Sequence, residues 1–179
     1  MYFNECMSGF EHQVAAHMLY EGLVEEGLAV ERLIHDRYHA ARRNPWNEVE
    51  CGDHYARAMA SYGVFLGACG FEYHGPKRHL GYAPRIRPEE FKAAFTAAEG
   101  FGTIEQKREE KKQTQRIVVY RGKLRLKTLT VELEKEAAAV KIAAGYPLTS
   151  ELAGKRLRIT FKDELLLEPG KELSLQISV

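Results

Sequence analysis

The sequence predicts an α+β protein whose first part is helical and whose second part is built of strands. Up to about residue 100, apolar residues recur at the three- and four-residue spacing of helices. From about Gly102 onward, short runs alternate between apolar and polar residues, which is typical of half-buried strands. We therefore expect two parts, a helical one over residues 1–101 and a β-rich one over residues 102–179.

Two helices are expected near the start of the chain. Ser8 and Glu11 form a capping box, so Ser8 is the expected N-cap of the first helix. Its apolar stripe ends near Gly22 or Gly27, where glycine favours a stop. A second helix is expected over residues 28–43, because an Asn-Pro pair follows it directly.

Two more helices are expected further on. Residues 53–69 are apolar on nearly every side, which indicates a helix inside a core. Pro88, followed by two acids, favours the first turn of a fourth helix over residues 88–99. Three neighbouring helices would cover the apolar one poorly. We therefore expect that the chain continues upstream in its parent protein or needs a partner.

The β-rich part predicts an antiparallel strand meander. Residues 117–120 and 123–131 are expected to pair as a hairpin around Arg121-Gly122. A second hairpin is expected near the C-terminal end, with arms over residues 165–167 and 173–177. The charged run between the two halves, residues 107–115, is interpreted as a solvated linker or a strand edge.

Composition and charge narrow the classes of partner and the cellular compartment that are expected. The net charge of +1 implies no general attraction to nucleic acid or to anionic membranes. No apolar run approaches the roughly 18 residues that a membrane span needs. Met1 leads directly into the first motif, so no signal peptide is expected. The three cysteines show no CxxC spacing, which favours a reducing compartment, and we expect a cytoplasmic protein.

No cofactor and no metal site are expected. The sequence lacks the glycine-rich patterns that bind nucleotides and the HExxH pattern that binds zinc. His12 and His17 are five residues apart and do not share a helix face. His35 and His39 do share a face, but no acidic motif near them offers a third ligand, so an exposed polar face is the simpler interpretation.

The segment over residues 44–57 is the strongest functional candidate, because acids, a histidine and Arg57 crowd the start of an apolar helix. Polar groups in that position indicate a polar ligand, and charge-assisted hydrogen bonds are the strong ones. A structural alternative pairs Arg57 with Asp53, one helical turn earlier. Glu48 and Glu50 flank Val49. The alternative interpretation is that both are acidic residues on a surface loop.

Two catalytic interpretations of the same region stay open. Glu5, Glu48 and Glu50 include enough carboxylates for a glycosidase pair, which needs a separation of about 5 Å in a retaining enzyme. Cys51 lies three residues before His54, a spacing compatible with an activated thiol. A buried structural cysteine is the simpler interpretation of Cys51.

Several segments resemble one family of enzymes, glycoside hydrolase family 116, which includes the bile-acid β-glucosidase, also called non-lysosomal glucosylceramidase. The similar region covers about residues 4–106, and its motifs occur in the family's order. The segments are residues 4–17 (NECMSGFEHQVAAH), 24–29 (VEEGLA), 44–61 (NPWNEVECGDHYARAMAS), 70–73 (GFEY) and 98–103 (AEGFGT).

The resemblance implies a fold. Members of this family combine an N-terminal β-sandwich with an (α/α)6 toroid. By this resemblance, residues 1–101 are the last helices of the toroid, and the strand meander over residues 102–179 follows them.

The resemblance also implies a set of sugar-binding residues. Family members hold glucose in the −1 subsite through an acid in the position of Glu48, an arginine in the position of Arg57 and a further acid in the position of Glu5. Some relatives have tryptophan where this chain has Met7, so the shape of the site or its aglycone preference differs. The family's catalytic nucleophile and acid/base belong to upstream motifs that this sequence lacks, so we expect no catalytic residue here.

Three functions follow as hypotheses. The chain is the C-terminal part of a retaining β-glycosidase of the β-glucosidase or glucosylceramidase kind, or a non-catalytic carbohydrate-binding remnant, or a structural fragment. The expected partners are a β-glucoside or related carbohydrate and the missing N-terminal part of the same enzyme. Neither nucleic acid nor a membrane span is expected.

Overall fold

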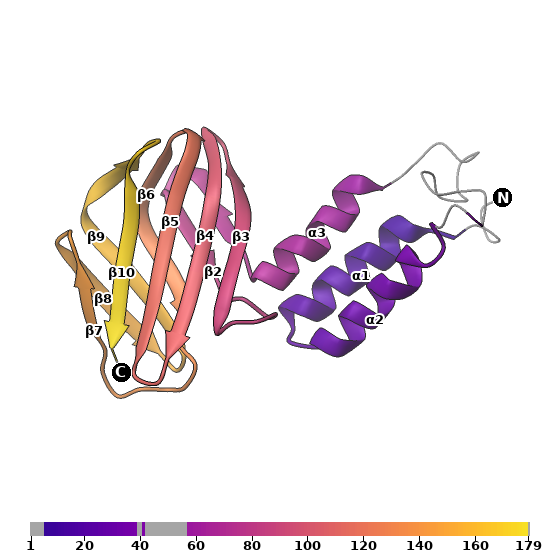
Figure 1. Ribbon diagram of the computed structural model, residues 1–179, viewed down its shortest axis with the longest axis horizontal. Helices are drawn as coiled ribbons and strands as arrows, with labels where there is room; N and C mark the ends of the chain where they lie inside the picture. Colours follow the sequence, from indigo (N-terminus) through magenta and orange to yellow (C-terminus); the bar gives the residue numbers. More distant parts are fainter. Residues whose placement is uncertain (1–5, 39–40, 42–56, 179) are drawn as a thin grey trace. The chain divides into compact units, whose positions relative to one another are not determined.

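The computed structural model describes residues 6–38, 41 and 57–178 and divides the chain into two compact units, residues 1–70 and 71–179. The first unit contains helices and the second contains almost only strands (Figure 1). The division falls after Gly70, well before the expected boundary at residue 101. Residues 71–101 therefore belong to the β-rich unit.

The first unit is a layer of three helices, α1 (Ser8–Tyr20), α2 (Val24–His35) and α3 (Ala58–Cys69). Helix α1 packs against both of the others. Two glycines allow this close approach. A Cβ at Gly27 of α2 would lie 3.0 Å from the carbonyl oxygen of Ala15, and one at Gly67 of α3 would lie 3.0 Å from that of Ala16.

The predicted bounds of the helices need correction, first at the start of α1. Met7 is the N-cap of α1 and makes no side-chain cap bond, so Ser8 is the first residue of the helix, and its hydroxyl accepts a hydrogen bond from the Tyr38 hydroxyl at 2.8 Å. Helix α2 lies earlier than the expected range of 28–43. Helix α3 begins after Arg57, and the expected start at residue 53 lies outside the described residues.

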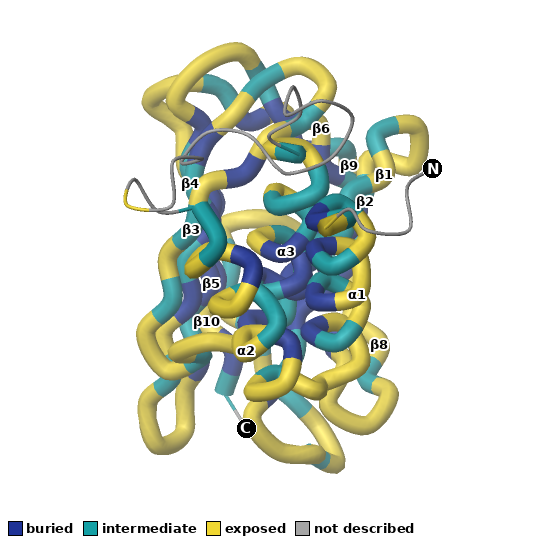
Figure 2. Tube along the Cα trace, turned by 90° about the vertical axis from the view of Figure 1, so that its right-hand side faces the viewer, coloured by how far each residue is buried: buried dark blue, intermediate teal, exposed yellow. Residues whose placement is uncertain are grey.

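Helix α3 is also less buried than its sequence predicts. Only Val64, Gly67 and Cys69 are buried in it, whereas Met59 is 91% exposed. The apolar sequence of α3 therefore exceeds what the described helices cover. In Figure 2, exposed colour likewise dominates α2.

The second unit is a β-sandwich of two five-stranded sheets, with the strand orders β1-β2-β6-β9-β8 and β3-β4-β5-β10-β7 (Figure 1). All strand pairs are antiparallel except β2 with β6. A short 3-10 turn, Gly75–Lys77, joins β1 to β2. The strands are β1 (Glu72–His74), β2 (His79–Tyr82), β3 (Glu90–Ala97), β4 (Gly100–Glu109), β5 (Lys112–Gly122), β6 (Leu124–Glu132), β7 (Lys141–Ala144), β8 (Leu148–Ala153), β9 (Arg156–Leu167) and β10 (Glu172–Ser178).

One apolar core lies between the two sheets. Alternate residues along each long strand point into it, as the pleat of a strand requires. Leu129, Ile159 and Phe161 enter from one sheet, while Ile117 and Leu175 enter from the other. Both sheets therefore share a single hydrophobic interior.

The expected fourth helix over residues 88–99 is wrong, because this segment is strand β3. Phe95 is buried and Phe91 is half-buried, while Lys92 between them is exposed, which is a strand period. Strand β3 pairs with β4 along the whole length of β3. Pairing with β4 has overridden the helical start signal at Pro88.

The strand meander is partly as expected. Strands β3, β4 and β5 run antiparallel in sequence order. The two expected hairpins are wrong, because β5 and β6 lie in different sheets, as do β9 and β10. The charged run over residues 107–115 lies in β4 and β5 and in their turn, and it contains Gln113 and Gln115, whose side chains are buried.

Candidate functional site

Arg57 is the predicted site residue that the structure describes. It lies directly before α3 with φ 50° and ψ 33°, in the left-handed region. This conformation disfavours residues with a Cβ and costs a non-glycine residue about 1–2 kcal/mol. Backbone strain of this kind gathers at functional sites, where the surrounding structure enforces it.

The Arg57 side chain lies across the first turn of α1. A Cβ built at Gly9 would lie 3.3 Å from Cδ of Arg57 and 3.6 Å from its Nε. A side chain at position 9 would therefore crowd the Arg57 side chain at Cγ, Cδ and Nε. Gly9 and Arg57 belong to two sequence motifs that the structure brings side by side.

A hollow of about 660 Å³ opens beside this contact. It has the size of a site for a small molecule. Its walls mix one cation and one amide with apolar groups, and Phe10 is 63% exposed at its edge. The lining residues are Gly9, Phe10, Gln13, Arg57, Ala58, Met59 and Ala60.

The other two predicted site residues, Glu5 and Glu48, lie outside the described residues. The same holds for Asp53, Cys51 and His54, which carried the alternative interpretations. The proposed meeting of Glu5 and Glu48 with Arg57 stays a prediction. The alternative ion pair between Asp53 and Arg57 also stays a prediction, because Asp53 lies outside the described residues.

A polar cluster near the first turn of α1 was not predicted. The guanidinium of Arg37 forms an ion pair with Glu11 and also donates to the Ser8 hydroxyl at 3.4 Å. Tyr38 donates to the same hydroxyl. These contacts tie the segment after α2 to α1, and they explain why Ser8 is buried.

His12 has a structural partner. Its Nδ1 lies 2.8 Å from Oε2 of Glu31 on α2, and the ring is buried. Sequence spacing could not show this pair, because the two residues are on different helices. In the described residues, no group of three His, Cys, Asp or Glu side chains is placed to hold a metal ion.

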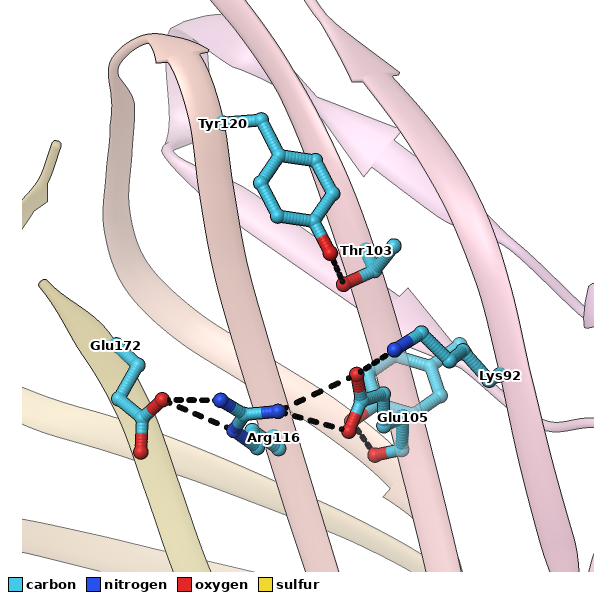
Figure 3. A network of polar contacts seen from close by, with 7 residues as sticks. Lys92, Thr103, Glu105, Arg116, Tyr120 and Glu172 are labelled. Atoms are coloured by element: carbon cyan, nitrogen blue, oxygen red, sulfur yellow. Dashed lines mark hydrogen bonds and ion pairs between the residues drawn. The ribbon is translucent and has the colours of Figure 1, made fainter. Parts of the chain in front are cut away.

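A second polar network, also not predicted, lies on the sandwich. Figure 3 shows Glu105 of β4 between Lys92 of β3 and Arg116 of β5. Nζ of Lys92 lies 2.8 Å from Oε1 of Glu105, and Nη1 of Arg116 lies 3.2 Å from Oε2. Arg116 also donates through Nε to Glu172 of β10 at 3.0 Å. The hydrogen bonds from Lys92 and Arg116 lower the pKa of Glu105, so this carboxylate stays charged.

A third polar group is on the other sheet. Glu72 of β1 lies 3.5 Å from Nε2 of His79 and accepts from Arg156 at 2.7 Å. These partners lower the pKa of Glu72 to about 2. Nδ1 of His79 lies 2.8 Å from the Thr128 hydroxyl. The group links β1, β2, β6 and β9.

No helix in the described ranges combines the length and apolar character that crossing a membrane requires.

Comparison with known proteins leaves the family undecided. The sequence matches no protein-family model and no curated protein. An α-L-rhamnosidase from Dictyoglumus thermophilum is similar in structure, with a TM-score of 0.41 and 11% sequence identity. The similar region covers 74% of this chain and 15% of that chain, so this chain spans a small part of the rhamnosidase's length. A score of this size does not establish a shared fold, and the resemblance to glycoside hydrolase family 116 and its toroid stays a prediction.

Proposed function

We propose that this chain is the C-terminal part of a retaining β-glycosidase of the β-glucosidase kind. In this role it supplies sugar-binding residues of the −1 subsite and not the catalytic carboxylates. The observation that carries the proposal is Arg57, held in a strained backbone conformation at the edge of a hollow of about 660 Å³.

The chemistry of the hollow suits a sugar. A pyranose ring has hydroxyl groups around its rim and C–H groups on its faces. Arg57 and Gln13 offer donors to the hydroxyls, and bonds from a charged donor are the stronger kind. Phe10 and Met59 offer apolar surface to the C–H groups. By the family resemblance, Glu48 and Glu5 accept hydrogen bonds from the same hydroxyls.

Catalysis is assigned to another part of the enzyme. A retaining glycosidase needs a nucleophile and an acid/base about 5 Å apart. The sequence lacks the family's motifs for both. Large apolar side chains are exposed on the helical unit, among them Phe10, Val14, Leu33 and Met59. Exposed apolar surface of this extent supports a covering partner, which we assign to the upstream part of the same enzyme.

A sugar-binding titration tests the subsite. Glucose and the iminosugar isofagomine are titrated into the wild-type chain, and we expect saturable binding that Arg57→Ala weakens at least about tenfold, or 1.4 kcal/mol. Arg32→Ala is the control, because Arg32 is an exposed arginine on α2 whose Nε lies 2.8 Å from Asp36 at the end of the helix. Equal affinity in the wild type and Arg57→Ala would refute the assignment of Arg57.

An activity assay separates the enzyme from the binding remnant. We expect no release of p-nitrophenol from p-nitrophenyl β-glucoside by the chain alone, because the catalytic pair is elsewhere. Mixing with the upstream part should restore release, and Arg57→Ala in the mixture should lower it. Sugar binding by the chain without any turnover in the mixture would favour the non-catalytic alternative.

A further inference from the structure

We propose that the outer face of the sheet β3-β4-β5-β10-β7 is a second carbohydrate site, which binds a neutral oligosaccharide independently of Arg57. The site has two ends. One is a hollow crossed by a network of ion pairs, and the other is an aromatic pair on β4 and β5.

The first end is a hollow of about 510 Å³ over four strands. Most of its lining side chains are charged groups of both signs, and the others are a hydroxyl, two amides and the ring of Phe91. They include Lys92, Glu105, Lys107, Thr114, Arg116 and Gln176. Such a lining offers many donors and acceptors beside the apolar surface of Phe91 and of the side-chain stems.

The ion pairs at this end fix the donors and acceptors in place. Glu105 accepts from Lys92 on one side and from Arg116 on the other, and Arg116 reaches on to Glu172 (Figure 3). Charges therefore alternate in sign across the sheet, and Lys92, Glu105, Arg116 and Glu172 cancel to zero. A charged ligand would have to displace one member from its partner. A neutral polyhydroxylated ligand can use the remaining lone pairs and N–H groups without breaking the network.

The second end is built around Tyr120. Phe101 of β4 pairs with Arg121 and Gly102 pairs with Val119, so Tyr120 is an extra residue in β5. Bulges of this kind re-aim a side chain. Here the Tyr120 hydroxyl lies 3.3 Å from the Thr103 hydroxyl, as Figure 3 shows, which fixes the ring across the strands.

The sequence is adapted to this bulge. A Cβ at Gly102 would lie 1.8 Å from the carbonyl oxygen of Val118, so only glycine fits. Tyr120 is nevertheless 54% exposed, and Phe101, on the same face by alternation, is 46% exposed. Two exposed rings on one sheet face offer a platform for the C–H face of a sugar ring.

The spacing of the two ends sets the size of the ligand. Tyr120 and Arg116 are four residues apart on β5, which is about 13 Å along a strand. The outward residues between them on β3, β4 and β5 are small, namely Ala94, Thr103 and Val118. The length along β5 separates the two backbone positions, and the Tyr120 ring covers part of it because its hydroxyl reaches Thr103. An oligosaccharide lying along β5 can contact the ring of Tyr120 and the ion pairs together.

Calorimetric titration of the full chain with four sugars tests this proposal. The sugars are glucose, the β-linked tetramer cellotetraose, the α-linked tetramer maltotetraose and the acidic tetramer tetragalacturonate. We expect saturable binding of at least one neutral tetramer, with Tyr120→Ala and Lys92→Ala each weakening it at least about tenfold. Tyr146→Ala and Lys171→Ala are the matched controls, because both residues are exposed in the same unit and outside this network. Thermal melting confirms that each variant is folded.

Arg57→Ala separates this site from the proposed −1 subsite. The second site predicts that Arg57→Ala keeps tetramer binding while losing glucose binding. The proposal is overturned if no neutral tetramer binds, or if tetramer binding survives Tyr120→Ala and is lost in Arg57→Ala. Tighter binding of tetragalacturonate than of both neutral tetramers would also overturn it, because the face would then select charge.

Discussion

At the scale of single residues, the helical unit shows strain where function is proposed. Arg57 adopts a left-handed conformation that glycine would adopt at no cost. The Arg57 side chain also lies where a larger residue at position 9 would intrude. Arginine at position 57 therefore lowers the free energy of unfolding, and in return its side chain is held in one place.

Arg57→Gly tests that trade directly. Relief of the left-handed backbone should raise the free energy of unfolding by about 1 kcal/mol, less the value of the contacts that the side chain makes. Sugar affinity should fall at least about tenfold in the same variant. Urea unfolding followed by far-UV circular dichroism gives the first quantity, and calorimetry gives the second. A variant that is clearly less stable than wild type would show that Arg57 is mainly a structural residue.

Glu72 gives a prediction about pH. His79 and Arg156 lower the pKa of its carboxyl from 4.5 to about 2 in the folded chain. A lowered pKa means that the charged form stabilises the fold above pH 4.5, and that this stabilisation is lost as the pH falls toward 2. Wild type should therefore lose its advantage over Glu72→Gln between pH 5 and pH 2.5, as measured by urea unfolding at several pH values. A stability difference that does not change with pH would contradict this account.

At the scale of elements, alternation and strand pairing decide whether a segment is a helix or a strand where local sequence signals do not. The sequence predicts α1, α2 and α3 as helices, because their apolar stripes are long and helical in period. It fails at β3, where Pro88 and two acids imitate a helix start, while the outcome depends on pairing with β4. Local sequence also cannot show that β5 and β6 separate into two sheets.

The candidate site shows the same limit. The sequence predicts Arg57 as a site residue, which stays a prediction, but the left-handed backbone and the contact with Gly9 depend on two helices that meet in space. The network of Lys92, Glu105 and Arg116 spans three strands and carries no sequence motif. The pair of the buried His12 and the half-buried Glu31 likewise joins two helices.

Gly102→Ala tests the bulge as an element. The added methyl group would meet the Val118 carbonyl, so the two strands must move apart. We expect a loss of about 2–4 kcal/mol of stability and a fall in melting temperature of at least about 10 °C. Gly145→Ala is the control, because a Cβ there has nothing within 4 Å. Equal melting of Gly102→Ala and wild type would show that the bulge is absent.

At the scale of the whole molecule, the two units differ in how complete their cores are. The sandwich buries large side chains from both of its sheets in one interior. The helical unit buries one small cluster, Ala15, Leu19 and Val64, and leaves Met59 and Phe10 exposed. We therefore expect the first unit to depend more on a covering partner than the second does.

Separate expression of the two units checks this difference. Residues 71–179 should unfold cooperatively by calorimetry, with a melting temperature close to that of the same unit in the whole chain. Residues 1–70 should show weak or no cooperative unfolding until the upstream part is added. A cooperative transition of residues 1–70 alone would contradict the need for a covering partner.

The order of the strands also decides where this chain can be cut. Strand β2 pairs with β6 in one sheet, and β3 pairs with β4 in the other. The sequence suggests a boundary at residue 102, and a protein that began there would lack both β2 and β3. One edge of β6 and one edge of β4 would then carry unpaired backbone donors and acceptors. Such open edges recruit strands from neighbouring molecules, and the truncated product would aggregate during expression.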